Sequence, residues 1–67
     1  MNWCERQRLE WIAEALRVYG FINREHLIRK FGISMPQASK DLQAFQRWHT
    51  HAMVYDVKKK HYTRVTP

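Results

Sequence analysis

The chain has 67 residues, of which 45% are hydrophobic and 27% charged, and it carries a formal net charge of +6. So short a chain forms one small domain rather than a large enzyme, and its composition is that of a folded protein. No apolar run approaches the roughly 20 residues needed to span a bilayer, and the first residues lack the pattern of a secretory signal. The only cysteine, Cys4, cannot form an intrachain disulfide. These features predict a cytoplasmic protein with no membrane partner.

The first predicted element is a helix from Cys4 to Tyr19, ended by Gly20. Apolar residues recur there at the i, i+3, i+4, i+7 spacing of one helix face, which we expect to face the core. They are Leu9, Ile12, Ala13, Leu16 and Tyr19. A second apolar line lies roughly opposite and is either buried under other elements or used in self-association. It consists of Cys4, Trp11, Ala15 and Val18, the candidate face of a possible homodimer.

A second helix is predicted to begin at Asn23, a good N-cap, and to end at Gly32. Its inward residues would be Leu27, Ile28 and Phe31. The next helix follows after only two residues, so the two helices must meet at a steep angle. That angle is typical of a helix-turn-helix unit.

The third helix has the clearest start, because the spacing of Ser34 and Gln37 is a capping-box pattern and Pro36 fits only in a first turn. We expect it to run to about Trp48. Its buried side would be Ala38, Leu42 and Phe45. The opposite side holds no carboxylate and offers amide and cationic donors, which suit base edges and phosphates in a DNA major groove.

Two β-rich runs close the chain, Met53–Val57 and His61–Val65. If Tyr55 pairs with Tyr62, the turn falls at Lys58-Lys59 and the runs form an antiparallel hairpin. The predicted fold class is therefore mainly α (α+β). It is a three-helix winged helix-turn-helix with a two-stranded β-hairpin as its wing, in a single domain over residues 1–67.

Specific residues can be assigned to a DNA contact on this arrangement. The predicted base-reading residues are Gln37, Lys40 and Gln43. The phosphate-binding set combines exposed cations with hydroxyl and backbone donors, including the free backbone amides of Met35 and Gln37 expected at the start of the third helix. This set is Arg24, Ser34, Met35, Ser39, Arg47, Lys58, Lys59 and Lys60. The three consecutive lysines have a second interpretation, as charges that protect a strand edge from aggregation.

The segments 24–27 and 31–42 resemble the N-terminal winged helix-turn-helix domain of WYL-domain transcriptional regulators, which are bacterial and phage repressors of defence islands. Tyr55-Asp56 and Lys60–Tyr62 resemble its wing. Residues 34–42 also resemble a DeoR-type recognition helix, with Ser39 in place of an Arg. In such regulators a WYL domain and a dimerisation domain would follow after Pro67. We expect either a part of such a regulator or a stand-alone small DNA-binding protein.

Other functions find less support in the sequence. His49, His51 and His61 could approach one another near the hairpin, but they lack the spacing of a zinc site. No nucleophile and base pair suggests an enzyme, and no motif indicates a cofactor or a small-molecule ligand. The predicted function is sequence-specific binding of double-stranded DNA at the nucleoid, as a transcriptional regulator that represses. The alternative is a winged-helix protein-interaction module, such as a small phage protein that binds an acidic host factor.

Overall fold

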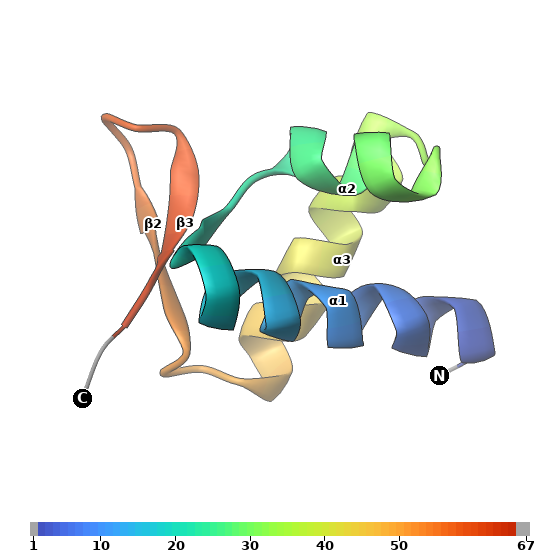
Figure 1. The fold of residues 1–67 in the computed structure, drawn as a ribbon, viewed down its shortest axis with the longest axis horizontal. Coiled ribbons are helices and arrows are strands. Elements are labelled where there is room, and N and C mark those ends of the chain that lie inside the picture. The colour runs from blue at the N-terminus through green and yellow to red at the C-terminus, as the bar shows by residue number, and fades with distance from the viewer. Residues whose placement is uncertain (1, 66–67) are drawn as a thin grey trace.

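The computed structural model describes residues 2–65, which form three helices and a three-stranded antiparallel sheet (Figure 1). The helices are α1 (Trp3–Tyr19), α2 (Arg24–Phe31) and α3 (Met35–Trp48). The strands are β1 (Phe21–Ile22), β2 (Met53–Asp56) and β3 (His61–Arg64). Helix α3 crosses behind α1, and the β2–β3 hairpin stands at one end of the molecule (Figure 1). The winged-helix class is confirmed, while Met1 and residues 66–67 of the expected domain lie outside the described residues.

The helix ends are set by local chemistry, as the sequence predicted. Gly20 and Gly32 follow α1 and α2 in the left-handed conformation, at φ of 82° and 66°, which a residue with a Cβ adopts only at a steric cost. Their amides donate to carbonyls four residues back, at 2.9 Å for Gly20 and 2.8 Å for Gly32. Two sharp corners therefore separate the helices.

Strand β1 is the element that the sequence analysis missed. It pairs with β3, with Phe21 opposite Thr63 and Ile22 opposite Tyr62, so that β3 is the central strand in the order β1-β3-β2. The expected two-stranded wing is thus part of a three-stranded sheet in the part of the chain that the structure describes. A two-residue strand is too short to show the alternation of apolar and polar residues by which strands are found.

The hairpin has the predicted register, since Tyr55 lies opposite Tyr62 and the two rings make an edge-to-face contact. Asp56 organises the turn, because its carbonyl accepts from the amide of Lys60 at 2.8 Å and its carboxylate from that of Lys59 at 3.0 Å. Lys60 adopts a positive φ of 56°, which the left-handed end of such a turn requires. The lysines thus sit on an ordered tip.

The core lies where the helices and the inner face of the sheet meet. Its fully buried side chains include Ile12, Ile22, Leu27, Leu42 and Met53. The expected inward stripe of the first helix is only partly right. Leu9, Ile12 and Leu16 are buried, whereas Ala13 is exposed and Tyr19 is 69% exposed.

The second apolar line of α1 proves to be largely a packing surface. Ala15 is buried, and the Trp11 ring meets that of Phe31 edge to face, with 5.7 Å between the ring centroids. Only Cys4 and Val18 of this line are exposed. Ala15 and most of Trp11 are therefore not available for a dimer contact, while self-association through the exposed part of α1 stays a prediction. Among residues 2–65, no helix has the length and apolar character needed to cross a bilayer.

Candidate nucleic-acid interface

The outer side of α3 presents a row of polar side chains to solvent. Lys40, Gln43 and Arg47 are exposed along it, while Ala38 and Leu42 on the opposite side are buried. This division follows from the helical period, because residues three and four apart share a face. Two of the three predicted base-reading residues, Lys40 and Gln43, are thus free to meet a groove.

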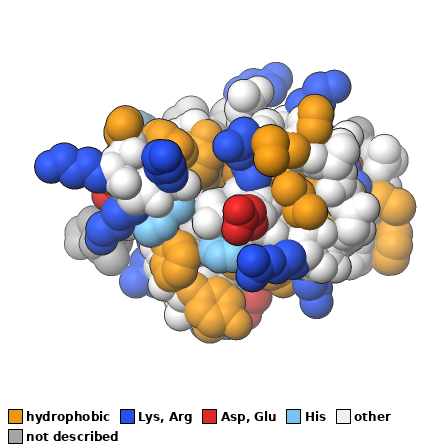
Figure 2. All heavy atoms as spheres, turned by 90° about the horizontal axis from the view of Figure 1, so that it is seen from above, with side chains coloured by type: hydrophobic (Ala, Val, Ile, Leu, Met, Phe, Trp, Pro, Cys, Tyr) orange, Lys and Arg blue, Asp and Glu red, His pale blue; other side chains and the backbone are white. Residues whose placement is uncertain are grey.

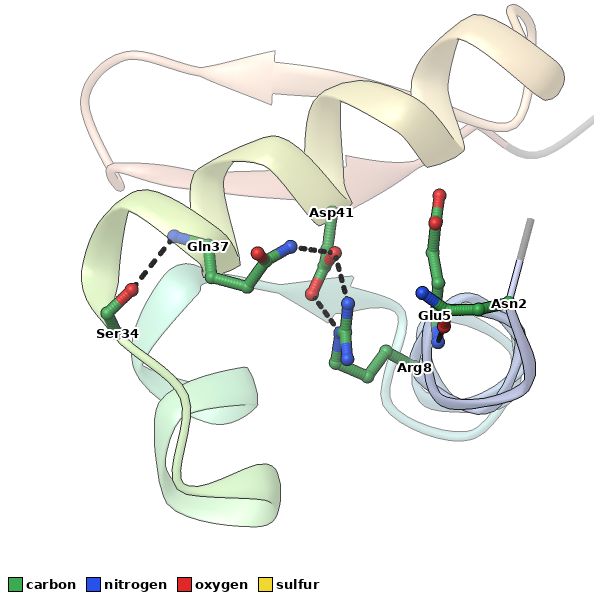
Figure 3. Close-up of polar contacts among 6 residues, drawn as sticks. All are labelled: Asn2, Glu5, Arg8, Ser34, Gln37 and Asp41. Carbon is green, nitrogen blue, oxygen red and sulfur yellow. Dashed lines mark hydrogen bonds and ion pairs between the residues drawn. The ribbon is translucent and has the colours of Figure 1, made fainter.

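Gln37, the third, is placed differently from the prediction. Its backbone amide donates to Oγ of Ser34 at 3.2 Å, which caps the helix, so this amide is not free for a phosphate. Its side chain does not return to Ser34 as a capping box requires. Nε2 of Gln37 instead donates to Oδ1 of Asp41 at 2.9 Å, and the residue is half-buried (Figure 3).

Asp41 anchors a polar cluster between α1 and α3 that the sequence analysis did not find. Its side chain is 2% exposed and accepts from Nε of Arg8 at 2.6 Å and from Nη2 at 3.3 Å (Figure 3). With the bond from Gln37, this buried carboxylate receives three hydrogen bonds, which compensates for its burial. The cluster therefore ties the first two turns of α3 to α1.

The start of α2 is closed by reciprocal hydrogen bonds. Asn23 Oδ1 accepts from the amide of His26 at 3.1 Å, and Nδ1 of His26 accepts from the amide of Asn23 at 3.2 Å. Burial, and secondarily the nearby Arg29, lower the pKa of His26 below its ordinary value of 6.5. A neutral imidazole is what this cap needs, because a protonated Nδ1 has no lone pair to accept with. The Asn23 cap was predicted, but the role of His26 was not.

A groove of about 230 Å³ runs between the start of α2, the outer side of α3 and the hairpin. It brings together predicted phosphate-binding residues from all three elements, namely Arg24, Ser39 and Lys60, with Gln43 beside them. Tyr55, His61 and Tyr62 also line it, although the sequence analysis did not single them out. A cationic groove lined with hydroxyl and ring groups suits a sugar-phosphate strand.

The tip of the hairpin carries three consecutive lysines. Lys58, Lys59 and Lys60 are all exposed there, and cationic side chains stand out from the hairpin side of the molecule (Figure 2). The nearest acidic neighbour, Asp56, is half-buried and committed to the turn. The tip therefore offers several positive charges in one place. Ser34 and Met35, the remaining phosphate candidates, lie exposed at the start of α3.

The histidines near the sheet pack against aromatic rings. His61 stacks on Phe21 at 4.7 Å between ring centroids, and His49 lies 4.6 Å from Phe45. Among the residues that the structure describes, no three His, Cys, Asp or Glu side chains gather in a way that could hold a metal ion.

A steep helix pair with an amide and cationic outer face, beside a lysine-tipped hairpin, defines a winged helix-turn-helix domain. The chain belongs to the family described as the BrxR transcriptional regulator winged helix-turn-helix domain, which matches residues 5–66. This membership confirms the resemblance to the N-terminal domain of WYL-domain regulators. The likeness to a DeoR-type helix stays a prediction.

Similar proteins include several described as DNA-binding transcriptional repressor CapW. The protein from Stenotrophomonas maltophilia is 39% identical over 62 residues, 92% of this chain and 21% of that protein. The protein from Escherichia coli (strain KTE188) is 42% identical over 61 residues, 91% of this chain and 20% of its own length. The protein from Pseudomonas aeruginosa is 40% identical over a similar span. The chain thus spans about a fifth of the length of these relatives.

Proposed function

We propose that this domain binds duplex DNA at a specific sequence and represses transcription by occupying a promoter at the nucleoid, in the cytoplasm. The observation that carries the proposal is the carboxylate-free outer side of α3, which is continuous with the groove that leads to the hairpin. The names of the CapW relatives, with the family description, support the same function.

In the proposed complex, α3 lies in the major groove, with Lys40 and Gln43 at base edges and Gln37 at the start of the helix. Phosphates on either side are held by the predicted set. That set is Arg24, Ser34, Met35, Ser39, Arg47, Lys58, Lys59 and Lys60. The backbone amide of Gln37 is left out of it, because Ser34 already occupies that amide.

Selection of bound sequences from a random duplex pool tests the proposal, followed by affinity measurements over a range of salt concentrations. We expect one enriched sequence, and an affinity that falls steeply with salt as counterions are released. Arg47→Ala should weaken binding. The matched control is Arg17→Ala, which removes the same charge from α1, where Arg17 pairs with Glu14. Absence of duplex binding would contradict the proposal and favour the protein-interaction alternative.

Repression itself is tested in cells with a reporter gene whose promoter carries the enriched sequence. Production of the protein should lower reporter output, and mutation of the sequence should restore it. A homodimer remains part of the proposal, because two recognition helices read a longer site than one. We include no metal, cofactor, small-molecule ligand or catalytic step in this function.

A further inference from the structure

The polar cluster of Arg8, Asp41 and Gln37 does more than join two helices, because it fixes the direction in which the Gln37 oxygen points. An ionised carboxylate only accepts hydrogen bonds, so the side chain of Gln37 must turn its nitrogen, and not its oxygen, toward Asp41. The fork of Arg8 holds that carboxylate in place from the other helix, with N–O distances of 2.6 and 3.3 Å.

The oxygen of Gln37 is consequently left for other partners. Nε2 donates to Asp41 at 2.9 Å, and no hydrogen bond within residues 2–65 engages Oε1 (Figure 3). Gln37 is half-buried in the first turn of α3, beside Lys40 in the same hollow of the surface. The side chain therefore offers Oε1 as an acceptor in a fixed direction, next to the second hydrogen of Nε2, which Asp41 does not take.

We propose that Asp41, held by Arg8, is a positioning residue that makes Gln37 select a base whose exocyclic amine lies in the major groove, adenine or cytosine. In the major groove, N6 of adenine and N4 of cytosine are donors, whereas O6 of guanine and O4 of thymine are acceptors that repel the Gln37 oxygen. In the major groove every base pair presents one such amine, on either one strand or the other. The proposed contact therefore determines which strand carries the adenine or cytosine. This inference rests on the proposed function.

The experiment compares enriched sequences from a random duplex pool for the wild type and variants. Gln37→Ala identifies the position that Gln37 reads, as the one whose preference disappears. There the wild type should favour adenine or cytosine over guanine or thymine by about tenfold, as expected for a polar base contact. Gln43→Ala is the matched control, and it should leave this position unchanged.

Two further variants test the positioning role. Asp41→Asn lets the Gln37 amide turn either way, so the preference at this position should flatten while other positions keep theirs. Because that variant leaves Arg8 without its carboxylate, the double variant Arg8→Met/Asp41→Met replaces the whole ion pair with apolar side chains. It should show the same local flattening while a thermal melt reports a cooperative fold.

The outcomes separate this inference from the proposed function. A wild type that enriches no sequence would overturn both. An enriched sequence with guanine or thymine at the Gln37 position, or one that Gln37→Ala leaves unchanged, would overturn the inference alone. The same holds if the folded double variant keeps the adenine or cytosine preference.

Discussion

His26 links the stability of α2 to the protonation of a single ring. Its imidazole must be neutral to accept from the amide of Asn23, and it packs against Phe21, near Glu25 and Arg29 of its own helix and His61 of β3. Since burial lowers its pKa below 6.5, the unfolded chain takes up this proton at a higher pH than the folded chain does. The contribution to stability is present above pH 6.5 and is lost as the pH falls through the pKa of the folded state.

We therefore expect His26→Gln to make the free energy of unfolding less dependent on pH between about 7 and 5, measured by urea denaturation. Glutamine keeps an oxygen that can accept from Asn23 but takes up no proton. His51→Gln, at an exposed position before β2, is the matched control and should retain the wild-type dependence. An equal dependence in all three proteins would show that His26 does not couple the cap to pH.

Lys40 and Gln43 present a second test at single residues. Both lie on the outer side of α3, away from the buried Ala38 and Leu42, so replacement by alanine leaves the core intact. Each replacement should preserve the melting temperature and lower affinity for the selected sequence by about 1–3 kcal/mol, with less effect on random DNA. Competition binding with the two kinds of duplex measures the difference. Equal effects on both would assign these side chains to phosphates instead.

At the scale of elements, the hairpin is expected to hold DNA without reading it. Replacing Lys58, Lys59 and Lys60 together with glutamine should weaken binding to all duplexes by similar factors, because phosphates carry little sequence information. The slope of log affinity against log salt should fall by about 0.9 for each phosphate that the variant no longer neutralises. An unchanged slope would mean that these lysines only protect the strand edge.

The elements that the sequence predicted well are those decided by neighbouring residues. The ends of the helices follow from Asn23, Ser34, Gly20 and Gly32, whose effects reach only three or four positions along the chain. The hairpin register followed in the same way from two aligned β-rich runs and the turn between them.

The features that the sequence did not reveal depend on distant partners. Strand β1 exists because β3 lies beside it, and Phe21 meets Thr63 only in the folded chain. The burial of Asp41 depends on Arg8, which lies 33 residues away. Either apolar line of α1 could have faced inward by its period alone, and the contact of Trp11 with Phe31 of α2 forms only in the folded chain. The exposed polar residues on the outer side of α3 could accordingly be predicted from the sequence. The cluster of Arg8, Asp41 and Gln37 that ties α3 to α1 could not.

At the scale of the whole molecule, two copies are expected to bind inverted half-sites whose centres lie about 10 bp apart, or a multiple of that spacing. The contact between the copies is tested at Val18, which is 54% exposed on α1. Replacing Val18 should disturb the fold less than replacing Trp11, which packs against Phe31. Val18→Glu should lower self-association in sedimentation experiments and leave the thermal melt of the domain unchanged. A wild type that sediments as a monomer at micromolar concentration would contradict pairing through α1.

The central position of β3 in the sheet also determines the order in which the helices and the sheet can form during synthesis. Both of its neighbours, β1 and β2, come earlier in the chain, so neither can pair until residues 61–64 have left the ribosome. Ile22 of β1 and Met53 of β2 both belong to the core. Until β3 is made, the strands that carry them have no pairing partner. The helices can form during synthesis from local contacts, whereas the sheet waits for its last strand. A nascent chain therefore acquires α3 before it acquires the hairpin that we propose to hold the DNA backbone, and a chain interrupted between them would lack that proposed contact.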